Sequence, residues 1–203
     1  MHSKKTINFL IVGQGIAGTT LAHKLFASGY SVHLIDNKYQ SSSSLIAGGV
    51  VHPMSFKRAI LSWKADSLIP VAKAYYDAFE AAFKTKVFYE LGMTRVFSSM
   101  EEQNNWQGRM ADSPMKDIIG DEELSLDFPF GSGKVNMAGR VDVALYLSRS
   151  KEFFKEEDTI SEEQFDYNQL SYFETGIEYK GIEAENIIFC EGFKINQNPY
   201  FNY

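Results

Sequence analysis

Three glycines near the N-terminus have the spacing that brings a polypeptide backbone close to a phosphate. Gly13, Gly15 and Gly18 follow the pattern G-x-G-x-x-G. In this pattern the first glycine makes a tight turn, the second lets the backbone approach a pyrophosphate, and the third lets a helix pack closely on a strand. The pyrophosphate lies on N–H groups at the helix start, where the helix dipole favours anions. Ile16 and Ala17 fall in that first helical turn.

An acidic residue stands where the ribose of a dinucleotide is expected. Asp36 comes eighteen positions after Gly18, and a carboxylate at this distance accepts hydrogen bonds from ribose hydroxyl groups. The next residue is Asn37, and no arginine follows directly. This pattern argues against a bound 2′-phosphate, so the motif favours FAD or NAD over NADP.

A strand, a helix and a second strand must hold these residues. Apolar residues over 6–12 predict a buried strand, and residues 16–28 have a helical period that ends at Gly29. Residues 30–35 predict the second strand, which ends at Asp36. A glycine turn without a ligand is the alternative interpretation. The binding mechanism is favoured because the strand, the helix and the acid all fall where it needs them.

A second stretch with paired glycines runs from Ser44 to Pro53. Gly48 and Gly49 lie among small apolar residues, and His52 comes just before the proline. Such a sequence indicates a backbone that passes close to something flat or bulky. A glycine-rich loop that only turns the chain is the alternative interpretation.

The glycine motif, Asp36 and the run Ser-x-x-Ala-Gly-Gly-x-x-x-Pro from Ser44 together resemble the FAD-dependent oxidoreductases of the D-amino acid oxidase and glycine oxidase family. The resemblance includes the flavin domain of the bifunctional enzyme that modifies the wobble uridine of tRNA. It implies FAD as the cofactor, with the ADP part on the first glycines and the acid, and the flavin ring along the Ser44 loop. The residues that it implies for FAD binding are Gly13, Gly15, Ile16, Ala17, Gly18, Asp36, Asn37, Ser44, Ala47, Gly48, Gly49, His52, Cys190 and Gly192.

Cys190 and Gly192 enter through a late apolar strand over residues 185–189. In the family, a small-residue turn after this strand lies near the FAD pyrophosphate and adenosine, and it usually reads Ala-Thr-Gly. This chain has Cys190-Glu191-Gly192 at that place, so an acid replaces the usual small polar residue.

The middle of the chain has mixed patterns. Residues 55–83 predict two helices divided at Pro70, and residues 86–91 and 93–97 predict a hairpin of two strands. Lys57 and Arg58 are candidate ligands for a substrate carboxylate, although a solvated helix face is the favoured interpretation. Further predicted segments are a helix over 101–110, an acidic loop over 121–133 and a strand over 134–139.

The last part of the chain returns to a helix and strands. Residues 141–154 predict a helix, and the charged run over 151–163 predicts its solvated end and a loop. Residues 171–175 and 177–180 flank Gly176 as a hairpin does.

The predicted fold class is therefore α/β, with a Rossmann-like FAD-binding domain formed by residues 1–53 and 141–203. Residues 54–140 form an inserted α+β region with antiparallel sheet that belongs to the substrate-binding part. Compared with the family, this region is incomplete and the C-terminal segment with further flavin and substrate contacts is missing. We therefore expect the N-terminal part of a longer protein.

Composition limits the partners. The 203 residues carry a net charge of −6, which gives no large basic field for nucleic acid. No apolar run reaches the length of a membrane span, and a signal-peptide interpretation of Lys4, Lys5 and the next strand is disfavoured because the strand continues into the glycine motif. The single cysteine, Cys190, fits a reducing cytoplasm. No residues have metal-ligand spacing, so we predict no metal.

The leading functional hypothesis is an FAD-dependent oxidoreductase that oxidises an amino acid or another small amine. The hydride leaves the substrate carbon for the flavin directly, so no catalytic acid or base is assigned. One alternative is flavin-dependent modification of the tRNA wobble uridine, which the acidic balance disfavours. The other is a non-catalytic dinucleotide-binding module, if the chain is naturally truncated.

Overall fold

The computed structural model describes residues 5–37, 42–56, 59–111, 115–125 and 127–201. It divides into two units, each with its own sheets. Residues 1–47 and 143–203 form the first, which we call the terminal unit, and residues 48–142 form the second, the middle unit. The candidate substrate ligands Lys57 and Arg58 lie outside the described residues.

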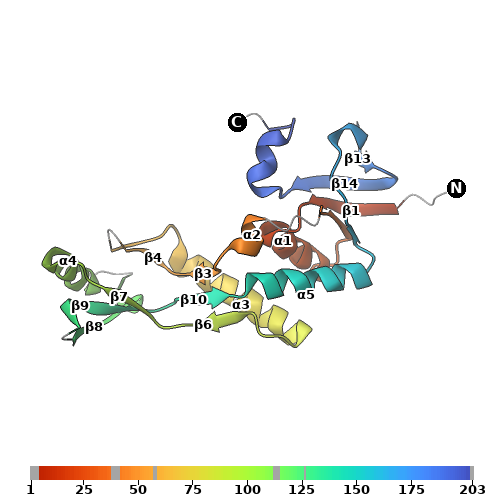
Figure 1. The fold of residues 1–203 in the computed structure, drawn as a ribbon. Helices are drawn as coiled ribbons and strands as arrows, with labels where there is room; N and C mark the ends of the chain where they lie inside the picture. Colours follow the sequence, from red (N-terminus) through yellow and green to blue (C-terminus); the bar gives the residue numbers. More distant parts are fainter. Residues whose placement is uncertain (1–4, 38–41, 57–58, 112–114, 126, 202–203) are drawn as a thin grey trace. The chain divides into compact units, whose positions relative to one another are not determined.

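The terminal unit is built on a six-stranded sheet with the order β11-β2-β1-β14-β13-β12. Figure 1 shows β13, β14 and β1 of this sheet. Its strands are β1 (Lys5–Val12), β2 (Val32–Ile35), β11 (Ile160–Ser161), β12 (Leu170–Phe173), β13 (Gly176–Tyr179) and β14 (Ile182–Phe189). The strands β11, β2, β1 and β14 run parallel, while β12 and β13 form an antiparallel hairpin beside β14. This mixture of a parallel sheet with helices confirms the predicted α/β class.

Helices cover one face of this sheet. The helical elements of the unit are α1 (Ile16–Ala27), α2 (Ser43–Ile46), α5 (Val143–Glu156) and the 3₁₀ turns η2 (Tyr167–Gln169) and η3 (Gly192–Gln197). Ile11 and Leu34 of the sheet pack with Ala22 of α1 and Phe154 of α5. The alternate strand residues face the other side, where they form a second core. That core includes Ile7, Leu10, Val12, Ile35, Phe165, Ile177, Tyr179 and Ala184.

Most elements of the terminal unit agree with the sequence pattern, including the strand over 6–12, the first helix, the helix over 141–154 and the hairpin at Gly176. The strand β11 is an exception, because it lies inside the charged run that was expected to be a loop. Its backbone pairs with β2 through Leu34 N to Thr159 O at 2.8 Å and Asp36 N to Ser161 O at 3.0 Å. A strand of two residues is too short to show a periodic pattern in the sequence. Its position is set by hydrogen bonds to the backbone groups at the edge of β2.

The middle unit contains three small antiparallel sheets, with orders β3-β10-β6, β7-β9-β8 and β4-β5. Its strands are β3 (Val50–Val51), β4 (Met54–Ser55), β5 (Ile60–Leu61), β6 (Phe88–Glu90), β7 (Met93–Val96), β8 (Ile119–Ser125), β9 (Phe128–Val135) and β10 (Gly139–Val141). Its helices are α3 (Ala65–Phe83), α4 (Met100–Met110) and the 3₁₀ turn η1 (Met115–Asp117).

The prediction of two helices over 55–83 is wrong. Ser55 is the end of β4 and residues 60–61 form β5, and a single helix, α3, then runs through Pro70. Proline removes one backbone hydrogen bond from a helix. The helix continues because Tyr76 and Phe79, on the turns that follow, are buried, and Tyr76 stacks on Phe88 of β6 with ring centroids 5.8 Å apart.

The hairpin predicted over 86–97 is also wrong, because its two strands pair with partners much later in the chain. Tyr89 of β6 lies opposite Arg140 of β10, and Thr94 of β7 lies opposite Lys134 of β9. The predicted acidic loop over 121–133 is instead most of the β8–β9 pair. Local periodicity indicates that a segment is extended, but it does not say which strand it will pair with.

A tryptophan on α4 forms the core of the middle unit with β9. Trp106 is 2% exposed, and its ring lies directly on the backbone of Gly133. A Cβ on Gly133 would be 2.2 Å from Cε2 of Trp106. Ser99 caps the same helix by accepting a hydrogen bond from Glu102 N.

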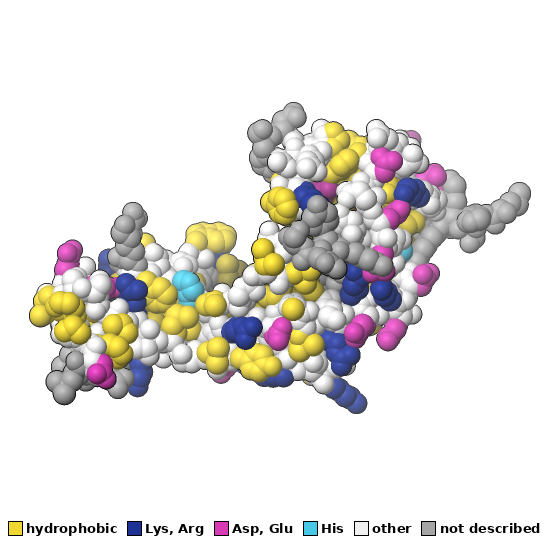
Figure 2. Space-filling view, in the orientation of Figure 1, with side chains coloured by type: hydrophobic (Ala, Val, Ile, Leu, Met, Phe, Trp, Pro, Cys, Tyr) yellow, Lys and Arg dark blue, Asp and Glu magenta, His cyan; other side chains and the backbone are white. Residues whose placement is uncertain are grey.

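Figure 2 shows Lys and Arg side chains interspersed with Asp and Glu side chains on the face that it presents. No helix in the described ranges is long and apolar enough to cross a membrane.

We predict that Gly133→Ala lowers the free energy of unfolding by about 1–3 kcal/mol, because the new methyl group must displace the Trp106 ring from a packed core. Urea denaturation followed by tryptophan fluorescence measures this change. The control is Gly108→Ala on α4, where a Cβ meets no atom within 4 Å. That variant should be neutral or more stable, since alanine is the better helix former. Equal stability of Gly133→Ala and wild type would contradict the packing described for Trp106.

Candidate dinucleotide site

The turn from β1 to α1 is tied to both neighbouring strands. Gly13 has φ of +104° and donates its N–H to Ile35 O of β2 at 2.8 Å. On the other side, Cys190 N, which follows β14, donates to Val12 O at 2.7 Å. A Cβ on Gly13 would lie 2.4 Å from Cys190 O, so no side chain fits at this position.

The other two glycines of the motif also stand where a Cβ has no room. A Cβ on Gly18 would be 1.9 Å from Gly13 O, which places the first turn of α1 directly on the end of β1. A Cβ on Gly15 would be 2.9 Å from Ser44 Oγ. The same hydroxyl oxygen accepts a hydrogen bond from Ile16 N at 3.2 Å. Ser44 therefore lies at the N-terminus of α1, beside the bare backbone of Gly15.

Asp36 is held at the carboxyl end of β2 by the motif itself. Its Oδ1 accepts a hydrogen bond from Gln14 N at 3.0 Å. Gln14 is 8% exposed, and its side-chain Nε2 donates to Leu147 O of α5 at 3.0 Å. Gln14 thus links the turn, the acid and α5. Sequence reasoning missed it, because it occupies a variable position of G-x-G-x-x-G and gives no signal of its own.

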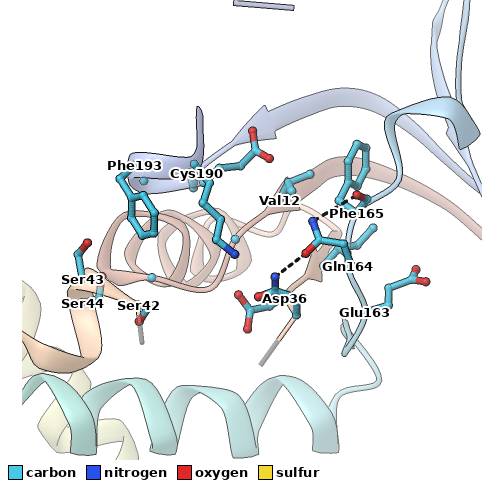
Figure 3. Close-up of a pocket in the computed structure, with 17 residues that line it drawn as sticks. Val12, Asp36, Ser42, Ser43, Ser44, Glu163, Gln164, Phe165, Cys190 and Phe193 are labelled. Carbon is cyan, nitrogen blue, oxygen red and sulfur yellow. Dashed lines mark hydrogen bonds between the residues drawn. The ribbon is translucent and has the colours of Figure 1, made fainter. Parts of the chain in front are cut away.

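A pocket opens at the carboxyl ends of the parallel strands, where β1 has neighbours on both sides (Figure 3). This is the place at which open α/β sheets bind ligands. Figure 3 shows Ser42, Ser43 and Ser44 at one end and Gln164 and Phe165 at the other, with Asp36 between them. The residues that line the pocket are Val12, Gly13, Gly15, Ile35, Asp36, Asn37, Ser42, Ser43, Ser44, Glu163, Gln164, Phe165, Cys190, Glu191, Gly192, Phe193 and Lys194.

Half of the residues predicted from the sequence to bind the cofactor line this pocket. They are Gly13, Gly15, Asp36, Asn37, Ser44, Cys190 and Gly192. The backbone N–H of Ile16 donates a hydrogen bond to Ser44 Oγ, which belongs to the pocket lining. Gly18 is buried behind the turn, and the side chain of Ala17 is exposed. The lining residues from 163 to 165 and Lys194 were not expected. They come from the segment after β11 and from η3, where these positions carry no sequence motif.

The remaining predicted residues follow α2. Ala47 ends that helix in the terminal unit, and Gly48, Gly49 and His52 belong to the middle unit. Gly49 has φ of +69°, and its carbonyl oxygen accepts a hydrogen bond from Val141 N at 2.8 Å. A Cβ on Gly48 would meet only Val50, at 4.0 Å. His52 is exposed and stacks on Phe56, with ring centroids 5.0 Å apart.

Glu191, the acid that departs from the family pattern, has polar partners for both carboxylate oxygens. Oε1 accepts a hydrogen bond from the hydroxyl of Tyr167, and Oε2 accepts one from Asn198 Nδ2 at 2.7 Å. Burial and the neighbouring Glu191 raise the pKa of Tyr167 above its usual value, and the same two causes raise the pKa of the Cys190 thiol. The thiol is therefore kept protonated, and Glu191 fastens η3 to the segment before the hairpin.

A half-buried histidine, His23, lies between α1 and α5. The Ser150 hydroxyl donates to Tyr146 O at 2.8 Å, so its oxygen must accept from His23 Nε2, which lies 2.9 Å away. The ring of His23 also packs on Phe154, with centroids 4.7 Å apart. Burial lowers the pKa of His23 to about 4, so the imidazole is neutral at pH 7.

The site has the features that an FAD nucleotide needs. The bare backbone of Gly13 and Gly15 forms a glycine cradle in the lining of the pocket, the N-terminus of α1 provides backbone amides, and Asp36 offers carboxylate oxygens to ribose hydroxyl groups. Lys194 adds a positive charge to the lining. These residues therefore fit the ADP part of FAD. In the part of the chain that the structure describes, no three His, Cys, Asp or Glu residues gather as a metal site would require.

A comparison of the sequence with known families agrees with this geometry. The profile of the FAD dependent oxidoreductase family (DAO) matches residues 8–152, which is most of the chain. The chain belongs to this family. The match covers α1, Asp36, the Ser44 loop and the whole middle unit.

Solved structures with the same fold include an L-amino acid deaminase and two oxidases. L-amino acid deaminase from Proteus vulgaris superposes with a TM-score of 0.70 at 18% identity, over 98% of this chain and 51% of that one. Iminodiacetate oxidase from Chelativorans superposes with a TM-score of 0.66 at 19% identity, over 94% of this chain and 56% of that one. Glycine oxidase from Bacillus cereus superposes with a TM-score of 0.63 at 16% identity, over 89% of this chain and 55% of that one. The chain thus spans about half the length of these proteins.

The half-buried His23 predicts a pH dependence of stability. Its pKa is lower in the folded chain than its usual value of 6.5, so the unfolded chain binds more protons between pH 6.5 and 4, and stability must fall as the pH falls through that range. Between pH 7 and 4.5 this group alone should lower the free energy of unfolding by about 2–3 kcal/mol.

The variant His23→Gln can still donate to Ser150 but does not titrate, so its loss of stability between these two pH values should be smaller than that of the wild type. Urea denaturation at both pH values measures the difference. An unchanged loss would mean that His23 is protonated as easily in the folded chain as in the unfolded one.

Proposed function

We propose that this chain is the FAD-binding part of an oxidoreductase that oxidises an amino acid or another small amine. The observation that supports it most directly is the pocket in the terminal unit. There the glycine cradle, the N-terminus of α1 and Asp36 lie in the order in which a dinucleotide presents its pyrophosphate and ribose.

In this proposal the pyrophosphate lies against Gly13, Gly15 and the first turn of α1. Ser44 Oγ accepts from Ile16 N and keeps its own hydroxyl hydrogen available, so it can donate to a phosphate oxygen. Asp36 accepts from the ribose hydroxyl groups while Gln14 N holds its carboxylate in place. Lys194 contributes electrostatic attraction for the two phosphate charges.

The stretch from Ala47 to His52 is the proposed flavin-facing segment. A Cβ on Gly48 would meet nothing closer than Val50 at 4.0 Å, so its backbone leaves space on that side for a flat ring. Gly49 holds its left-handed conformation through the bond from Val141 N. FAD, when bound, supplies the hydride acceptor. The protein supplies orientation, so we assign no side chain as a catalytic acid or base.

We extend the proposal to the two units. The terminal unit serves as the FAD-binding domain, and the middle unit serves as part of the substrate-binding region. The substrate class rests on the names of the similar structures, which refer to L-amino acids, glycine and iminodiacetate. All of these carry a nitrogen beside a carboxylate-bearing carbon. The single cysteine, Cys190, is in keeping with a reducing compartment such as the cytoplasm.

The proposal predicts that the purified chain binds FAD and that Asp36→Asn weakens the binding about tenfold or more. The amide keeps an acceptor for Gln14 N but loses the charge that strengthens hydrogen bonds from ribose. Quenching of flavin fluorescence measures the affinity. The matched control is Glu185→Gln, an exposed acid on β14, which should bind FAD as the wild type does.

A wild-type chain that shows neither bound flavin absorbance nor a higher melting temperature with FAD would overturn the proposal. FAD binding without oxidation of any amino acid, tested with the chain and with any longer form of the protein, would retain the cofactor and reject the substrate class. Oxidation of one amino acid and not of its N-blocked form would establish the amine as the reacting group.

A further inference from the structure

Two amide side chains meet at the end of the pocket that lies beyond Asp36. Asn37 Nδ2 donates to Gln164 Oε1 at 2.6 Å, across 127 positions of sequence. Both residues line the pocket, and Figure 3 shows Gln164 on the far side of Asp36 from the three serines. With the pyrophosphate at α1 and the ribose at Asp36, this end is where the base of the dinucleotide would lie.

The two residues are placed by the sheet. Asn37 follows β2 by two positions, and Gln164 follows β11, which pairs with β2 in parallel. The next residue, Phe165, is 5% exposed and stacks on Tyr179 of β13 with ring centroids 4.5 Å apart. A buried ring on one side and a strand pair on the other fix the backbone at Gln164.

Hydrogen bonding sets the direction of both amides. Gln164 Nε2 lies 3.5 Å from the carbonyl oxygen of Phe165, which can only accept a hydrogen bond. The Gln164 oxygen must therefore face Asn37, and Asn37 must present its nitrogen to that oxygen. A rotated Asn37 amide would place two oxygens against each other. The fixed amide leaves its Oδ1 and one N–H for a ligand.

An oxygen acceptor beside an N–H donor is the edge that complements adenine. Adenine carries a donor, its N6 amino group, next to an acceptor, N1 or N7, and asparagine pairs with it through two hydrogen bonds. A 6-oxopurine has an acceptor in place of that amino group. An asparagine that is free to rotate could adapt to either base, but one whose nitrogen is tied to Gln164 cannot.

We propose that Asn37, oriented by Gln164, reads the base of the dinucleotide and selects adenine over 6-oxopurines. This inference rests on the proposed function, because it needs a dinucleotide in the pocket. Gln164 acts through Asn37 and is a positioning residue, whereas Asn37 contacts the base.

The test measures binding of ADP and IDP to the full chain by titration calorimetry, which requires no flavin and no turnover. The wild type should bind ADP about tenfold or more tightly than IDP. Asn37→Asp removes the donor, and Gln164→Leu frees the Asn37 amide to rotate. Each change should bring the ratio of the two affinities close to one.

Gln164→Glu is the matched control, because its carboxylate still accepts from Asn37 Nδ2. Its added charge should weaken both nucleotides alike and leave their ratio near that of the wild type. A merely structural role of Gln164 would change stability, seen as a lower melting temperature, without changing this ratio.

Equal binding of ADP and IDP by the wild type would overturn the inference, even if no variant folded. A preference for ADP that persists in Asn37→Asp and Gln164→Leu would also overturn it, and would leave the proposal of FAD binding intact. Failure of the wild type to bind either FAD or ADP would instead reject the proposed function, and this inference with it.

Discussion

The terminal unit depends on one backbone contact, between the carbonyl oxygen of Gly13 and Gly18. Because a Cβ at Gly18 would lie 1.9 Å from that oxygen, α1 can begin directly on the end of β1 only if no side chain is present. This contact brings the N-terminus of α1 to the carboxyl edge of the sheet. It also places Gln14 N within 3.0 Å of the Asp36 carboxylate. The anion-binding amides and the ribose-binding acid are thus two results of the same close approach.

The polar groups around this turn couple the pocket to the rest of the unit. Gln14 connects Asp36 to Leu147 of α5 through its backbone and side chain. One face of α5 also holds Ser150 against the half-buried His23 of α1. A ligand that binds only the folded chain therefore adds to a network that already holds α1 and α5 together, and it raises stability by mass action. This coupling makes melting temperature a direct readout of the pocket.

The middle unit shows how a long insertion can be placed in the chain of an α/β domain. The chain enters the unit at Gly48 and leaves it at Asp142. At these points β3 and β10 pair with each other, with Val51 opposite Gly139 and Val141 N bonded to Gly49 O. The segments by which the chain enters and leaves the middle unit therefore lie side by side and are hydrogen-bonded to each other. Its core, around Trp106, lies among its own residues.

The sequence by itself determined the elements whose signals are local. The glycine spacing, the helix closed by Gly29, the strand ending at Asp36 and the turn at Gly176 all depend on residues close together in the chain, and the structure has each of them. The family and its cofactor followed from the same glycines and acid.

Only the tertiary structure decided which distant segments meet. Nothing near Tyr89 indicates that Arg140 will lie opposite it, and nothing near Asn37 indicates Gln164, because pairing between segments far apart in the chain is selected by the whole fold. Pro70 stays within one helix because the aromatic residues of the following turns are buried. The physical reason is common to these cases: backbone preferences are local, whereas burial and hydrogen-bond partners exist only once the chain is packed.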